Sequence, residues 1–218
     1  MRRPTSRRGA LSVRALAMAA FAAVVACSPA AAPLSGTVAP VTAVPPSAKL
    51  RDPTLIQFRW EFKEEQLGLR GDGAARLAPP DSARLDLFLE GGFGSGAAFV
   101  IGNTITTGLP MADRIIPPAA LFWGALGRLA VPPGDTTVRV AGDTVRTEIT
   151  GAGGSFRAAF VRDSLVVLER IADGRVLERM ERRAGAVTYR QFSSRRSLDL
   201  TISRRATVAP FDPAIWPR

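Results

Sequence analysis

The sequence predicts a mainly β fold, an antiparallel sheet of about 10–11 strands that curls over one short helix. Hydrophobic and polar residues alternate with a period of two in several segments, as in strands with one buried face. Gly-Asp, Gly-Asn and Asp-Gly pairs lie between such segments, as hairpin turns do. One apolar segment near the middle of the chain has helical spacing instead.

Residues 1–26 have the composition of an export signal. Five arginines lie within residues 1–14, and residues 15–26 are all Ala, Leu, Met, Phe or Val. As a helix, this apolar stretch would span about 18 Å, well short of the roughly 30 Å hydrocarbon core of a bilayer. We therefore expect cleavage rather than a retained membrane span.

The only cysteine, Cys27, ends the string Val24-Val25-Ala26-Cys27, which resembles the lipobox of bacterial lipoproteins. The resemblance implies a diacylglyceryl group on Cys27 Sγ, cleavage after Ala26 and acylation of the new amino terminus, so that acyl chains hold the protein on one membrane leaflet. An ordinary secretory signal with a chance cysteine is the alternative. Ser28, where an Asp would retain a lipoprotein at the inner membrane, favours the periplasmic face of the outer membrane.

Residues 27–53 are predicted to join the lipidated cysteine to the folded body as a Pro- and Ala-rich tether. The segment holds six prolines, which disfavour both a helix and a sheet ladder. Proline-rich chain extends by about 3.1 Å per residue, so the tether would place the body tens of ångströms from the membrane.

The folded domain is expected over residues 54–218. Its first strand carries Phe58, Trp60 and Phe62 in alternation with charged residues, and Leu85, Leu87 and Leu89 alternate in the same way. Further strands are predicted within residues 161–171 and 197–208. The turns between strands are expected at Gly71-Asp72, Gly102-Asn103, Gly134-Asp135, Gly142-Asp143 and Asp173-Gly174.

A short helix is predicted over residues 117–127, which begin with two prolines and end near a glycine. Leu121, Phe122, Leu126 and Leu129 recur at helical spacing, so one face must rest on apolar side chains. We expect that partner to be the aromatic face of the first strand.

Composition excludes several classes of function. The chain has no histidine and one cysteine, which removes Ser-His and Cys-His catalysis, an intrachain disulfide and a thiolate metal cluster. Outside the signal, 24 basic and 19 acidic residues remain, without the interleaved aromatic and basic clusters of nucleic-acid-binding proteins. We expect no enzyme, cofactor, metal or nucleic-acid partner.

The lipobox, the aromatic first strand, the run of hairpins and the apolar helix within residues 109–131 together resemble the superfamily of the lipoprotein carrier LolA and the outer-membrane receptor LolB. Over residues 54–218, the resemblance implies a strongly curved antiparallel sheet, a half-barrel, with helices as a lid over an apolar cavity for acyl chains. The family usually has a helix before the first strand, where this chain has its proline-rich segment. The lid here would therefore be smaller.

Two groups of side chains are candidate sites. Phe58, Trp60, Phe62, Leu85, Leu87, Phe122 and Trp123 would surround the apolar cavity, with plain core packing as the alternative. Phe93, on the glycine-rich turn 90–95, matches the apolar loop with which LolB helps to insert lipoproteins, unless its ring packs on the sheet edge.

The leading functional hypothesis is a lipid-anchored, LolB-like module that binds acyl chains or lipoproteins, exchanges them with a periplasmic carrier and assists their localisation at the outer membrane. The alternative is a non-enzymatic structural or assembly lipoprotein that binds an envelope protein partner. An enzyme ranks third, since no nucleophile and base can be paired.

Overall fold

The computed structural model describes residues 28–92, 94–108 and 112–217. Its strands are β1 (Thr37–Ala39), β2 (Thr54–Glu64), β3 (Leu67–Ala78), β4 (Ser82–Leu89), β5 (Ser95–Ile101), β6 (Thr104–Thr107), β7 (Asp135–Ala141), β8 (Thr144–Gly151), β9 (Gly154–Val161), β10 (Ser164–Ala172), β11 (Arg175–Arg183), β12 (Ala186–Gln191) and β13 (Arg196–Thr207). The α-helices are α1 (Ala112–Ile115) and α2 (Ala119–Ala125), and single 3-10 turns are η1 (Val41–Ala43), η2 (Glu90–Gly92) and η3 (Pro213–Ile215).

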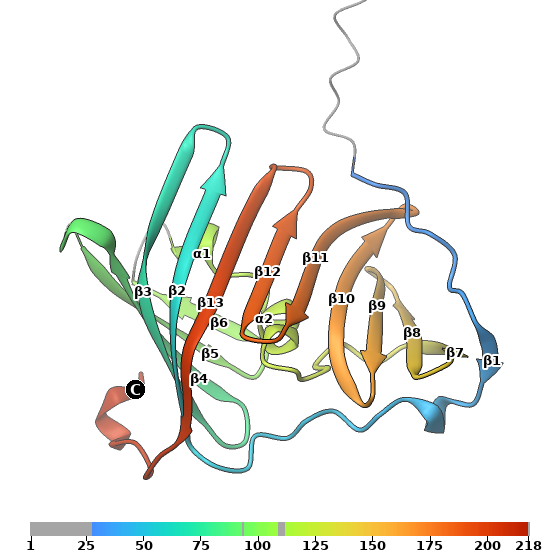
Figure 1. Cartoon of the computed structure of the whole chain (residues 1–218), viewed down its shortest axis with the longest axis horizontal. Coiled ribbons are helices and arrows are strands. Elements are labelled where there is room, and N and C mark those ends of the chain that lie inside the picture. The colour runs from blue at the N-terminus through green and yellow to red at the C-terminus, as the bar shows by residue number, and fades with distance from the viewer. Residues whose placement is uncertain (1–27, 93, 109–111, 218) are drawn as a thin grey trace, which may run out of the picture.

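All the strands belong to one antiparallel sheet, in the order β1-β7-β8-β9-β10-β11-β12-β13-β2-β3-β4-β5-β6. Two runs of hairpins, β2 to β6 and β7 to β13, join because β13 pairs with β2. The sheet curves around α2 and stays open, with β1 and β6 at its two edges (Figure 1). This confirms the predicted fold class of a curved antiparallel sheet with a short helix.

The sheet has 13 strands, more than the 10–11 expected from the sequence. One of the additional strands, β1, lies in the segment where the prolines predicted no sheet. Thr37–Ala39 falls between Pro33 and Pro40 and pairs with β7. An edge strand needs hydrogen-bonding groups on one side only, so a short proline-free window is enough.

The N-terminal segment, residues 28–53, runs along the body and is bonded to it at several points (Figure 1). The Val176 N–H donates to Pro29 O at 2.9 Å, and the Ala31 N–H donates to Gly174 O at 2.9 Å. Farther along, the Leu129 N–H donates to Ser47 Oγ at 2.9 Å. The structure therefore differs from the expected extended spacer, because carbonyl and hydroxyl oxygens of a proline-rich chain can still accept hydrogen bonds.

Helix α2 begins after Pro118 and ends before Gly127, whose φ is +88°, close to the predicted bounds. It packs mainly on β10 and β11 rather than directly on the first aromatic strand, β2. A Cβ atom on Gly124 would lie 2.8 Å from Leu168 Cδ2 and 2.9 Å from Met180 Cε. The missing side chain of Gly124 thus lets the helix approach these two strands closely.

Candidate functional site

A small apolar cavity lies between α2 and the concave face of the sheet. Its volume is about 70 Å³, whereas one water molecule needs roughly 10–15 Å³. The cavity therefore has room for several methylene-sized groups. Its wall consists of Ile56, Phe58, Ala75, Leu85 and Leu87 from β2 to β4, Ile116, Pro117, Phe122, Ala125 and Leu126 from the helical segment, and Met180, Val187, Tyr189, Leu198, Leu200 and Ile202 from β11 to β13.

The cavity is not fully enclosed. Most of its wall is buried, but Leu87, Ala125, Leu126, Leu200 and Ile202 are only half-buried. These five side chains mark its opening to solvent.

Two glycines of β3 make space for the aromatic side chains of β2. Gly73 is the cross-strand partner of Phe58, and a Cβ atom there would lie 2.5 Å from the phenyl ring. Gly71 is the partner of Trp60, and its Cβ would lie 3.1 Å from the indole. The two rings can therefore lie close against the β3 backbone, and Phe58 becomes part of the cavity wall.

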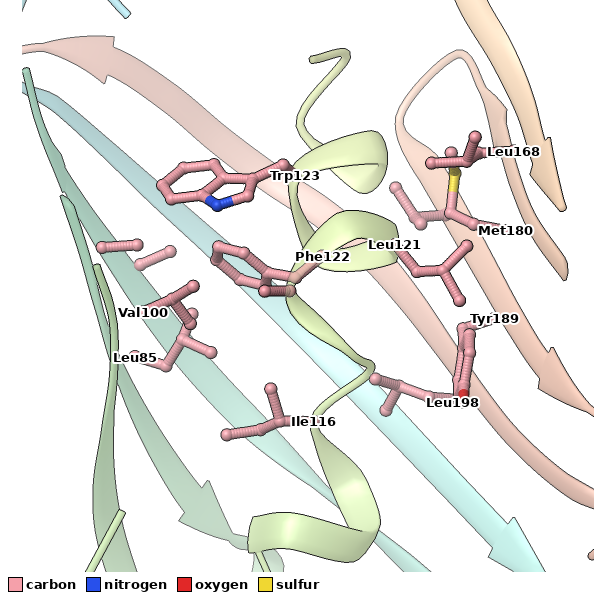
Figure 2. Packing of buried hydrophobic residues seen from close by; sticks show 14 of the residues in the cluster. Leu85, Val100, Ile116, Leu121, Phe122, Trp123, Leu168, Met180, Tyr189 and Leu198 are labelled. Carbon is pink, nitrogen blue, oxygen red and sulfur yellow. The ribbon is translucent and has the colours of Figure 1, made fainter. Parts of the chain in front are cut away.

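Helix α2 is fixed to both sides of the hollow (Figure 2). On one side, the Trp123 Nε1–H donates to Gly102 O, in the turn after β5, at 2.6 Å, and the Phe122 ring lies edge-on to the indole at 5.1 Å. On the other side, fully buried Leu121 points toward Met180 (Figure 2). The helix thus bridges the two runs of hairpins above the cavity.

Among the described wall residues, Tyr189 alone carries a hydroxyl group, and this hydroxyl is hydrogen-bonded. Its hydroxyl donates to Glu178 Oε1 at 2.6 Å, and Arg170 Nε lies 2.6 Å from Glu178 Oε2. Burial and the charge of Glu178 raise the pKa of the Tyr189 phenol. The phenol therefore stays protonated, with its hydroxyl bonded to Glu178.

The structure brings four of the seven cavity candidates together. Phe58, Leu85, Leu87 and Phe122 line the cavity, whereas Trp60, Phe62 and Trp123 are buried in the core without being part of the wall. Cys27 and Phe93 lie outside the described residues.

Half of the wall residues that sequence reasoning missed come from β11 to β13. Leu198, Leu200 and Ile202 alternate visibly in the sequence, but no local signal shows that their strand pairs with β2. Ala75 and Ala125 were not predicted either, because small side chains contribute little to the hydrophobic periodicity of a sequence.

Over the described ranges, no group of three or more His, Cys, Asp or Glu side chains is placed to hold a metal ion. In the same part of the chain, no helix has the length and apolarity needed to cross a membrane.

The fold is similar to that of solved structures of LolA-like proteins. A LolA superfamily protein from Nitrosomonas europaea matches with a TM-score of 0.52 at 11% identity, over 77% of this chain and 90% of that protein. A putative outer membrane lipoprotein-sorting protein domain from Vibrio parahaemolyticus matches with a TM-score of 0.49 at 7% identity, over 75% of this chain and 88% of that domain. No protein-family model and no curated protein matches the sequence. The likeness shows the fold, and confirms the resemblance inferred from the sequence.

Proposed function

We propose that this protein is a lipid-anchored lipoprotein of the cell envelope that binds acyl chains of lipids or lipoproteins and assists their localisation at the outer membrane. The observation that carries the proposal is the cavity beneath α2, whose wall is apolar apart from the engaged hydroxyl of Tyr189. Such a wall offers a polar ligand no free partner, whereas each methylene group that leaves water contributes about 0.8 kcal/mol.

The size of the cavity sets how an acyl chain fits. A volume of about 70 Å³ accommodates a short stretch of chain. The rest of a longer chain would extend through the open side, along half-buried Leu200 and Ile202. The proposed ligand is therefore partly enclosed and remains able to leave, as a carrier or receptor requires.

Filling the cavity tests this proposal. Ala75 is buried on the concave face opposite Ile56, so in the Ala75→Phe variant the ring would occupy the cavity. We expect uptake of a fluorescent fatty acid to weaken by about tenfold or more, since excluding two or three methylenes removes roughly 2 kcal/mol. Uptake is measured by fluorescence titration of the purified protein.

The matched control is Ala74→Phe, because Ala74 pairs with Gln57 on the opposite face of the same strand. It should bind the fatty acid like the unchanged protein. Leu200→Phe, at the half-buried opening, serves as a second blocking variant should Ala75→Phe fail to fold. Unchanged uptake by a folded blocking variant contradicts the proposal. If the protein without substitutions takes up no fatty acid, the result favours the alternative, an assembly lipoprotein that binds an envelope protein partner.

The proposed cellular location rests on the N-terminal sequence. We propose that residues 1–26 are removed, that Cys27 carries the lipid, and that the protein faces the periplasm from the outer membrane. The string Val24-Val25-Ala26-Cys27 and the absence of Asp after the cysteine support this proposal.

We further propose that Phe93 inserts into the membrane during ligand transfer. The proposal is supported by the glycines that precede Phe93, since the φ values of 84° at Gly91 and 75° at Gly92 show that the chain turns there. In the Phe93→Glu variant we expect transfer of the fluorescent fatty acid to vesicles to slow by about tenfold, because the apolar contact of one phenyl ring is lost. Equilibrium uptake should be unchanged.

Phe88 provides the control for this experiment. It lies 48% exposed on β4, near the same turn but within the sheet. Phe88→Glu should leave transfer unaffected. Equal transfer rates for Phe93→Glu and the unchanged protein exclude the insertion role of Phe93.

A further inference from the structure

We propose that the cavity takes amphiphiles with an anionic head group, a carboxylate or a phosphate, and that Lys49, Arg128 and Arg205 bind this head at the rim. The inference rests on the proposed function, in which the cavity binds the apolar tail of the amphiphile, and adds the recognition of its head group.

The rim is a second, smaller hollow, of about 40 Å³, adjoining the apolar cavity. Leu126 lines both hollows, so they lie on either side of this side chain. Three separate parts of the chain meet there: Lys49 comes from the N-terminal segment, Arg128 follows α2, and Arg205 lies at the end of β13. Among the described residues that line this hollow, the charged side chains are these three cations.

A β-bulge places Arg205 on the concave face. The pairing register of β13 with β2 shifts between Ile202 and Arg204. Beyond the bulge, Arg205 pairs with Ile56, a residue of the cavity wall, while Arg204 pairs with exposed Gln57. The strand thus presents Ile202 to the cavity and then Arg205 to its rim.

Arg128 has hydrogen-bond donors without acceptors. Its Nε and Nη1 atoms are buried and have no hydrogen-bond partner within the described residues. The guanidinium lies over the Trp123 ring at 4.6 Å, and its pKa is lowered by burial against a weaker opposing effect of Asp81. A buried donor left unpaired destabilises the folded state. An oxyanion at the rim would satisfy these donors through charge-assisted hydrogen bonds.

The positive charge at the rim is not neutralised by direct salt bridges. Within the described residues, no carboxylate forms one with Lys49, Arg128 or Arg205, although the charge of Asp81 acts on Arg128 from farther away. Nearby Arg182 adds to the excess, since its pKa is lowered first by burial and then by the charge of Arg205. In contrast, several half-buried arginines of the sheet are paired with acids, among them Arg76, Arg84, Arg157, Arg170, Arg179 and Arg196. Cationic side chains next to an apolar cavity favour an anionic amphiphile over a neutral amphiphile.

The experiment separates the head from the tail. Dodecanoate, methyl dodecanoate and inorganic phosphate are each titrated against the fluorescent fatty acid bound to the purified protein. Dodecanoate should compete about tenfold better than the ester, the factor that corresponds to one charge-assisted hydrogen bond. Phosphate alone should compete weakly, because it lacks the tail.

Arg205→Gln and Arg128→Gln should each remove the preference for dodecanoate and leave the affinity for the ester unchanged. Arg204→Gln is the matched control, since Arg204 neighbours Arg205 on the opposite face of β13. Thermal unfolding confirms that each variant is folded. Equal binding of acid and ester by the unchanged protein overturns the head-group site but leaves the acyl-chain proposal standing. Failure of both probes to bind overturns the acyl-chain proposal itself.

Discussion

Arg170→Met is expected to lower the free energy of unfolding by about 1–3 kcal/mol at neutral pH, because the Glu178 carboxylate is buried while Arg170 is 39% exposed. Arg170 Nε lies 2.6 Å from Glu178 Oε2, and the Glu178 side chain is only 1% exposed. Methionine keeps most of the apolar length of the side chain but removes the charge, so the buried carboxylate retains only the Tyr189 hydroxyl as a described partner. Urea unfolding measures the loss.

A second substitution identifies the cause of this loss. In Arg170→Met with Glu178→Gln, the buried group is neutral and can still accept the hydrogen bond from Tyr189. Most of the lost stability should return, because removing both members of a buried pair costs far less than removing one. A loss below about 1 kcal/mol in the single variant would show that solvent already screens the pair.

Replacing residues 1–27 with an ordinary secretory signal, cleaved before Ser28, is expected to move the whole protein from the membrane fraction to the soluble periplasmic fraction. The acyl chains proposed for Cys27 would contribute about 0.8 kcal/mol for every buried methylene, so the anchored form should be almost completely bound. Fractionation followed by immunoblotting measures the distribution of both forms.

Fatty acid uptake by the soluble form provides the control, since the cavity lies entirely within residues 56–202 and does not include the anchor. Uptake should equal that of the anchored protein. Recovery of the unchanged protein in the soluble fraction would support the alternative reading of Cys27 as a chance cysteine after an ordinary signal.

Local patterns in the sequence predict much of this fold. The alternation at Phe58, Trp60 and Phe62 gives β2 correctly, and the apolar spacing after Pro118 gives α2. These features depend on near neighbours in the chain, so a single sequence reveals them. The open antiparallel sheet follows from successive hairpins without crossover helices.

The parts that the sequence does not reveal depend on distant contacts. The pairing of β13 with β2 joins residues far apart in the chain and closes one side of the cavity. The bulge after Ile202 reverses which face of the sheet each following residue occupies. Simple alternation therefore assigns Arg205 to the convex face instead of the concave face. Gly124 determines where α2 packs because it has no side chain, and a missing side chain gives no hydrophobic signal in the sequence.

The bonding of the N-terminal segment determines how the anchored protein would stand on the bilayer. Ser28 is buried, its carbonyl accepts from Arg175 Nη1 at 3.0 Å, and Pro29 is bonded to β11 as well. With the lipid on the preceding residue, the turn between β10 and β11 would sit at the leaflet surface, and the domain would have little freedom to rotate. The same end of the sheet would then always meet the lipid head groups, and the cavity would keep a fixed height and angle above them.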